Sequence, residues 1–165
     1  MKAVTYFSLL FICMGSASAL AQRAAPAPAP ATDLAMEAAA RAIAVCTANG
    51  FNVAVSVVDS AGGVRVLAVA DGAGARLGTP ATRKATAAVT FGVPTATLEE
   101  QVKTDAELAA RFDAESATLY ARAGGLPLFA NGEVIGAIGV GGAPDGMQDE
   151  LCAAEGVAAI QDRLM

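Results

Sequence analysis

Apolar and polar positions change their spacing several times along this chain, and each change marks an expected element. Residues 33–48 predict a helix, because apolar side chains recur every three or four positions. Thr32 or Asp33 can cap its first turn, and Asn49-Gly50 is a typical helix end. The folded part of the chain is therefore expected to begin with a helix.

Two β-hairpins are predicted from alternating apolar positions. The first pairs residues 52–59 with 64–70. The second pairs residues 126–129 with 134–140 around Asn131-Gly132, a dipeptide that tolerates the positive φ angles of a type I′ turn. Glycines recur in the second hairpin, and a glycine in a strand lets another backbone or a flat ligand approach closely.

Two helices are predicted between the hairpins. Thr79-Pro80 opens the first, which runs to Phe91. Thr97 and Glu100 have the spacing of a capping box, so one further helix is expected as far as about Phe112.

The remaining segments complete the order of elements. Residues 113–123 are either a helical turn or an extended lead-in, and Asp145-Gly146 precedes a last helix over residues 147–163. Hairpins give antiparallel pairing. The order helix, hairpin, two helices, hairpin, helix therefore favours an α+β fold, with helices layered on an antiparallel sheet in a single domain over residues 33–165.

The first 32 residues have a different character. A lysine, an apolar run over residues 4–14 and small residues ending at Ala21 predict a secretory signal peptide over residues 1–21. A retained membrane anchor is the alternative, but the run is short for one. Residues 22–32 alternate Ala and Pro and predict a semi-stiff linker. We expect a periplasmic or secreted bacterial protein with no membrane attachment after cleavage.

Composition narrows the function classes. The formal net charge is −5, which argues against a nucleic-acid partner. The chain has no histidine and so lacks the usual general base and the commonest metal ligand. Signal cleavage would leave two cysteines, Cys46 and Cys152. In an oxidising compartment they predict one disulfide, and two buried thiols are the alternative.

Three strings carry a family resemblance: NVAVSVVDSAGGVRVLAVADGAG, RKATAAVTFGVPTATL and GGLPLFANGEVIGAIGVGGAPDGMQDELCAAEG. They resemble the GlcG/HbpS haem-binding protein family, and the resemblance extends from about Asp33 to Leu164. It implies a profilin-like fold of α/β/α layers and a homo-oligomer, often an octamer. Some members are secreted and bind haem in haem sensing, handling or protection from oxidative stress. Others lie beside glycolate or diol metabolism genes with no settled activity.

A haem site requires an apolar slot, a partner for the propionates and, where the iron is ligated, a donor atom. Arg83 or Lys84 is expected to pair with the propionates, and the alternative is that both belong to a solvated helix face. The expected walls of the slot are Phe91, Tyr120, Gly124, Gly125 and Leu126.

Without histidine, the main candidate ligands for the haem iron are Tyr120 and Thr118. One secreted family member is thought to use a threonine at a place that resembles Thr118. Tyr120 is the chemically stronger donor, although a tyrosine near an apolar hairpin also fits a packing role. Lys84, Met147 and a cysteine are further candidates.

The first functional hypothesis is therefore an oligomeric protein that binds haem or a similar planar tetrapyrrole. The alternatives are a small-molecule enzyme of this fold that works through Lys84 or a carboxylate, and an accessory subunit without a ligand. The carboxylates Glu99, Glu100, Asp149 and Glu150 lie where acids stabilise helix N-termini, which explains them without catalysis.

Overall fold

The computed structural model describes residues 28–165. The predicted signal peptide and residues 22–27 of the predicted linker lie outside the described residues. The elements in chain order are α1 (Thr32–Ala48), β1 (Ala54–Asp59), β2 (Val64–Val69), η1 (Ala75–Leu77), α2 (Gly78–Phe91), α3 (Thr95–Gln101), α4 (Ala106–Ala114), β3 (Gly125–Ala130), β4 (Glu133–Gly141), α5 (Gly146–Ile160) and η2 (Gln161–Arg163).

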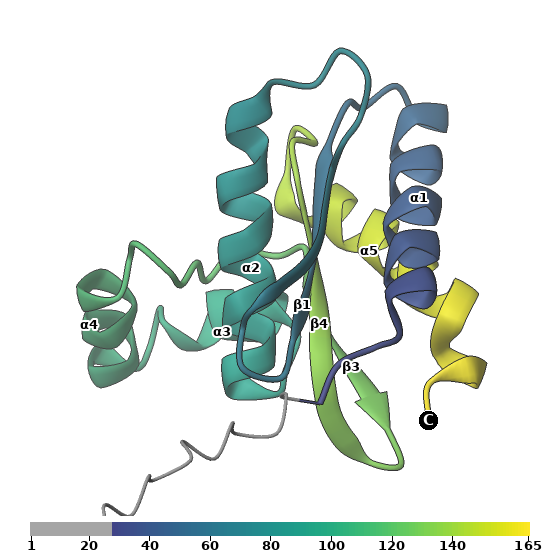
Figure 1. Cartoon of the computed structure of the whole chain (residues 1–165). Coiled ribbons are helices and arrows are strands. Elements are labelled where there is room, and N and C mark those ends of the chain that lie inside the picture. The colour runs from purple at the N-terminus through teal and green to yellow at the C-terminus, as the bar shows by residue number, and fades with distance from the viewer. Residues whose placement is uncertain (1–27) are drawn as a thin grey trace, which may run out of the picture.

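The four strands form one antiparallel sheet in the order β2-β1-β4-β3. The two predicted hairpins are therefore both present, and β1 of the first pairs with β4 of the second. Helices α1 and α5 cover one face of the sheet, and α2 covers the other, with α3 and α4 beyond it (Figure 1). The predicted α+β fold with helix layers around an antiparallel sheet is confirmed.

Strand β1 is central, and both of its faces are buried. Val55 and Val57 belong to the large core beneath α1 and α5, whereas Val58 packs with alanines of α2. Strand β2 is at the edge, and three of its apolar side chains, Val64, Leu67 and Val69, remain between 40% and 52% exposed. The α2 face of the sheet is thus incompletely covered at β2.

Glycines allow α2 to lie directly on β4. A Cβ at Gly139 would meet the carbonyl oxygen of Ala81 and would lie 2.6 Å from the backbone nitrogen of Ala85. On the opposite face, a Cβ at Gly156 of α5 would lie 2.6 Å from the carbonyl oxygen of Ala38 in α1. The close packing that the glycines predicted is therefore between backbones.

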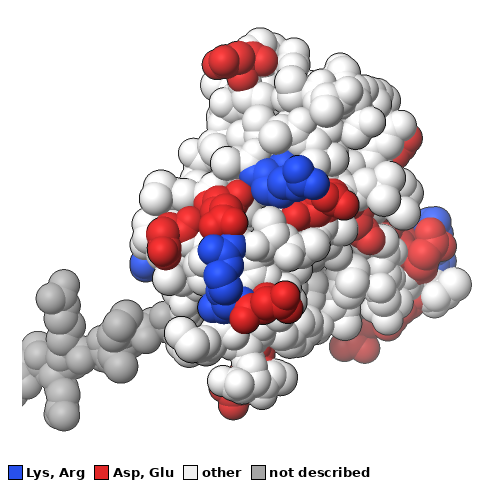
Figure 2. Space-filling view, turned by 90° about the vertical axis from the view of Figure 1, so that its right-hand side faces the viewer, with Lys and Arg blue, Asp and Glu red and all other residues white. Residues whose placement is uncertain are grey.

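Helices α1 and α5 are cross-linked on their shared face. Cys46 of α1 and Cys152 of α5 form a disulfide with a Cα–Cα distance of 5.6 Å. Two ion pairs, Arg41–Glu155 and Arg163–Glu37, join the same helices and the C-terminal turn, each at 2.6 Å. The basic side chains on the face shown in Figure 2 accordingly lie against acidic ones.

The turn at Asn131-Gly132 is confirmed, because the φ angles are 51° and 83°. The predicted helix caps are less successful. Neither Thr32 nor Asp33 is the N-cap of α1, which is Ala31, although the Asp33 side chain accepts a hydrogen bond from the Leu34 backbone N–H in the first turn. Thr79 lies inside α2, which already begins at Gly78.

The capping box at Thr97 and the single helix to Phe112 are wrong. Helix α3 begins after Pro94, whose carbonyl accepts a hydrogen bond from the Thr97 backbone N–H. A turn then separates α3 from α4, and the Asp105 side chain caps α4 by accepting a hydrogen bond from Leu108 N–H. The break lets the segment fold back toward Phe91, whose ring stacks on Phe112 with the centroids 5.3 Å apart.

Candidate functional site

A cleft of about 550 Å³ opens where α2 leaves β2 uncovered. Three parts of the chain that are distant in sequence form it: the first hairpin, the η1–α2 segment and the loop after α4. The lining residues are Ala61, Gly62, Leu67, Ala75, Gly78, Thr79, Thr82, Arg83, Thr86, Ala117 and Thr118. Its size lies in the range of about 300–1,000 Å³ that is usual for small-molecule sites.

The lining is mainly apolar or small. Leu67 forms part of the wall and remains 51% exposed. A Cβ at Gly78 would lie 3.3 Å from the methyl groups of Leu67, so the absence of a side chain at Gly78 keeps this end open. The cleft therefore offers a mainly apolar surface, to which four threonines and Arg83 add polar groups, as is usual for small-molecule sites.

Thr118 brings a hydroxyl group to the rim. Its Oγ1 donates a hydrogen bond to the carbonyl oxygen of Glu115 at 3.2 Å, and the residue is exposed. The hydroxyl proton is thereby engaged, while the oxygen lone pairs remain available as an acceptor or a weak metal donor. Two further hydroxyls of the cleft bond internally: Thr82 donates to Ser56, and Thr86 donates to the carbonyl oxygen of Thr82.

Arg83 contributes the cation among the lining residues of this cleft. Its Nε and Nη2 donate to the carbonyl oxygen of Leu119 at 3.3 and 3.0 Å. Its guanidinium also lies over the ring of Tyr120, 4.9 Å from the centroid. Arg83, Thr118 and Tyr120, all predicted site residues, are thus brought together.

Tyr120, however, does not line this cleft. It lines two neighbouring hollows, one beneath α4 and one beside Lys84 at the start of α5. Of the two predicted iron ligands, Thr118 is the one at the cleft, and Tyr120 lies against the arginine behind it.

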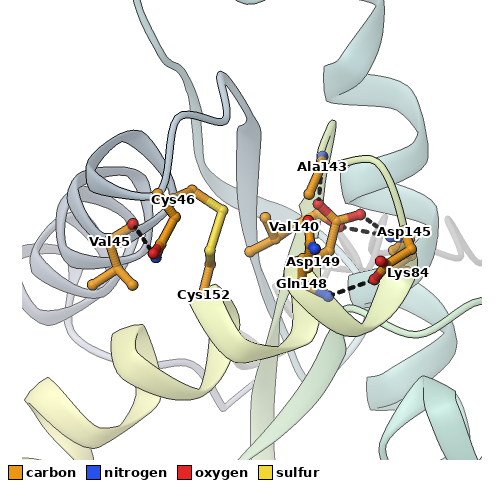
Figure 3. The surroundings of a disulfide bond; sticks show 10 residues. Val45, Cys46, Lys84, Val140, Ala143, Asp145, Gln148, Asp149 and Cys152 are labelled. Carbon is orange, nitrogen blue, oxygen red and sulfur yellow. Dashed lines mark hydrogen bonds and ion pairs between the residues drawn. A yellow bond between two sulfur atoms is a disulfide. The ribbon is translucent and has the colours of Figure 1, made fainter.

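Lys84 points away from the cleft into the protein. Its side chain is only 3% exposed, and its Nζ donates to Asp149 Oδ2 at 2.6 Å and to the carbonyl oxygen of Val140 at 2.9 Å (Figure 3). Asp149 Oδ1 accepts a hydrogen bond from the Ala143 backbone N–H at 2.9 Å. Neither a solvated Lys84 nor a Lys84 that is available to propionates agrees with these contacts, and both expectations are corrected.

Burial dominates the titration of this pair. It lowers the pKa of Lys84, and the nearby Asp149 carboxylate opposes that shift only in part. It likewise raises the pKa of Asp149 against the opposing effect of Lys84. The pair joins α2 on one face of the sheet to α5 on the other, one helical turn before the disulfide at Cys152 (Figure 3).

The other predicted wall residues do not form a slot. A Cβ at Gly125 would lie 2.5 Å from the carbonyl oxygen of Lys84, and one at Gly124 would lie 2.8 Å from the Lys84 Nζ. Phe91 packs with Phe112 against a separate small core, which consists of Ala87, Leu98, Phe112 and Leu119, and Leu126 packs against the large core. The space beside the second hairpin is therefore occupied by α2.

Sequence reasoning missed Leu67, Gly62 and Gly78. The sequence offered one indirect signal. Strand β2 carries apolar residues on both faces, so the side chains on one face remain exposed wherever no helix covers them. Which face would stay uncovered depends on where α2 crosses the sheet. The described residues contain no cluster of three or more metal-ligating side chains, and no helix among them is both long and apolar enough to cross a bilayer.

Comparison with known proteins shows to which family this fold belongs. The family model for haem degrading protein HbpS-like matches residues 31–158. The chain belongs to the HbpS-like family. That match includes every residue of the cleft, of the Lys84–Asp149 pair and of the disulfide.

Solved structures agree with this membership. HbpS is 32% identical and superposes with a TM-score of 0.74, covering 84% of this chain and 94% of HbpS. The ORFY protein of Klebsiella pneumoniae is 25% identical with a TM-score of 0.76, covering 88% of this chain and 99% of ORFY. A PduOC–haem complex is 25% identical with a TM-score of 0.73, covering 80% of this chain and 95% of PduOC. A search among curated protein sequences gave no match.

Proposed function

We propose that this HbpS-like protein binds haem, or a similar planar tetrapyrrole, in the cleft between β2 and α2. The observation that carries the proposal is the cleft itself: about 550 Å³, largely apolar, open to solvent and bordered by a cation and a hydroxyl group. Membership of a family named for haem degradation and likeness to a PduOC–haem complex support it.

Thr118 is the proposed protein ligand of the iron. It is the predicted donor that lines the cleft, and its proton is held by the Glu115 carbonyl, which leaves oxygen lone pairs free. A neutral hydroxyl is a weak ligand, so binding is expected to depend mainly on apolar contact and to be reversible. An open cleft allows propionates to remain in water.

The proposed setting is a periplasmic or secreted homo-oligomer. The signal-like start of the chain supports export, and a disulfide between two buried cysteines suits an oxidising compartment. The uncovered edge strand β2, with Val64 and Val69 exposed, supports self-association. An enzyme that works through Lys84 is less favoured, because the amine is buried and engaged by Asp149.

Absorption titration with haemin tests the proposal. The wild-type chain is expected to shift and sharpen the Soret band as a stoichiometric complex forms. Thr118→Val, which keeps the shape but removes the oxygen, is expected to change the band position, whereas Tyr120→Phe is expected to leave it unchanged. A wild-type protein that gives no haem band would overturn haem binding, and an unaltered Thr118→Val band would overturn the ligand.

A further inference from the structure

The loop that carries Thr118 is joined to α2 by hydrogen bonds from one side chain, that of Arg83. Residues 115–118 are exposed, and the backbone hydrogen bonds of Ser116, Thr118 and Leu119 return to Asp113 or Glu115 in the same segment. Leu119 is buried in the small core, but apolar burial is not directional. Among the described hydrogen bonds, only those from Arg83 join residues 115–120 to α2.

Arg83 contacts the loop at two consecutive residues, Leu119 and Tyr120. Two guanidinium nitrogens converge on the Leu119 carbonyl oxygen, and the guanidinium plane lies over the Tyr120 ring. Thr118 is the residue immediately before these two contacts. Its approach to the cleft is therefore set by where Arg83, on a rigid helix, holds Leu119.

We propose that Arg83 is a positioning residue, which holds the Thr118 hydroxyl at the rim of the cleft and does not act chiefly as the partner of the ligand's carboxylates. This inference rests on the proposed haem site. The competing role is the one that the sequence suggests, in which Arg83 supplies a positive charge to the propionates.

Lysine separates the two roles. It keeps the charge, but a single ammonium cannot reproduce a planar fork that donates two hydrogen bonds to one carbonyl oxygen while it stacks on an aromatic ring. If Arg83 acts by position, Arg83→Lys resembles Arg83→Met. If it acts by charge, Arg83→Lys resembles the wild type.

The first experiment is haemin titration of the wild type, Arg83→Lys, Arg83→Met and Thr118→Val. Positioning predicts that both Arg83 variants move the Soret band toward that of Thr118→Val and weaken haem binding by about tenfold, a loss typical of a charged hydrogen bond. It also predicts that Arg83→Met adds little in a Thr118→Val background. Wild-type behaviour of Arg83→Lys would overturn the inference.

The second experiment needs no haem. The chain has two tyrosines, Tyr6 and Tyr120, and no tryptophan, so in a Tyr6→Phe background the tyrosine band of the near-ultraviolet circular dichroism spectrum reports Tyr120. Positioning predicts that this band loses intensity in Arg83→Lys and Arg83→Met, while the far-ultraviolet spectrum stays that of the folded protein. An unchanged tyrosine band in both variants would overturn it.

The two experiments keep the proposals apart. Absence of haem binding by the wild type contradicts the proposed function, yet the tyrosine signal still decides whether Arg83 holds the loop. Haem binding that responds to Thr118→Val but not to either Arg83 variant contradicts the positioning role alone.

Discussion

The two sides of helix α2 differ in what fills the space beside the sheet. Toward β3 and β4, backbone lies against backbone: Gly139 meets Ala81 and Ala85, and Gly125 meets Lys84. Toward β2, no element crosses the strand, Leu67 remains half exposed, and a cleft of about 550 Å³ is left. Helix α2 therefore covers the β3–β4 half of this face of the sheet and leaves a cleft beside β2.

The difference shows what glycine does in this fold. Where glycines repeat along β4, they remove side chains so that a helix can approach, and the space is used by the protein itself. Where glycine occurs singly at the start of α2, opposite an edge strand, its neighbour is the side chain of Leu67 and not a backbone. Whether space remains between α2 and a strand therefore depends on the position of α2 more than on the number of glycines.

The largest expected effect is on the closed side. Gly139→Val should prevent cooperative folding, because the new side chain would meet the backbone of α2, which cannot move without leaving the sheet. Valine favours strands, so local preference does not explain such a loss. Thermal unfolding measured by circular dichroism checks it.

Gly74→Val is the matched control, because Gly74 has an ordinary φ angle of −72° and nothing within 4 Å of its Cβ position. If Gly139→Val unfolded at the same temperature as Gly74→Val, the tight contact between α2 and β4 would be refuted.

The disulfide lies on the face of the sheet away from the cleft. Its contribution to stability can therefore be tested separately from ligand binding in the cleft. The Cys46→Ala/Cys152→Ala double variant should lose about 4–5 kcal/mol of unfolding free energy in the chain-entropy model, since the bridge spans 106 residues. Haem affinity at 25 °C should not change. Peptide mapping without reductant should find the two cysteines joined in the purified protein. Free thiols there, or a weakened haem complex in the double variant, would contradict this separation.

The buried pair Lys84–Asp149 lies on the side of α2 that is closed against the sheet. Removing one partner or the other should give the unfolding free energy opposite pH dependences. Asp149→Asn or Lys84→Met alone should cost about 3–5 kcal/mol, because each leaves a buried charge unpaired. The variant Lys84→Met/Asp149→Leu should recover much of that loss.

The signs follow from the shifted pKa values. In Asp149→Asn the folded pKa of Lys84 lies below its unfolded value, so the unfolded chain binds more protons and stability rises as pH increases between the two values. In Lys84→Met the folded pKa of Asp149 lies above its ordinary value of 3.8, so stability rises as pH falls through that window. Parallel pH profiles for the two variants, measured by urea unfolding, would disprove the coupling.

Local signals predicted most of the fold. Asn131-Gly132 and Asn49-Gly50 marked a turn and a helix end because Asn131, Gly132 and Gly50 adopt positive φ angles, which these residue types tolerate. The capping box at Thr97 failed because Pro94 had already fixed the start of α3 three residues earlier. Asp105, the side chain that does cap a helix, was overlooked inside an assumed single helix.

The site was predictable only in part. Arg83 and Thr118 were named from residue chemistry and do share a cleft, but Lys84, the next residue on the same helix, points into the protein and pairs with Asp149. Small residues surround α2 on several sides, so periodicity does not indicate which cation is buried. Leu67, Gly62 and Gly78 depend on how a hairpin and a helix cross in space, which no local pattern in the chain encodes.

The most direct measurement of the central claim is a haemin titration of the wild type, Gly78→Val and Gly74→Val, with the unfolding free energy of each measured alongside. Valine at position 78 would push against Leu67 and fill the open side of α2, so we predict haem binding weaker by at least about tenfold in Gly78→Val and unchanged in Gly74→Val. A folded Gly78→Val protein that binds haem as tightly as the wild type would show that the ligand site lies elsewhere.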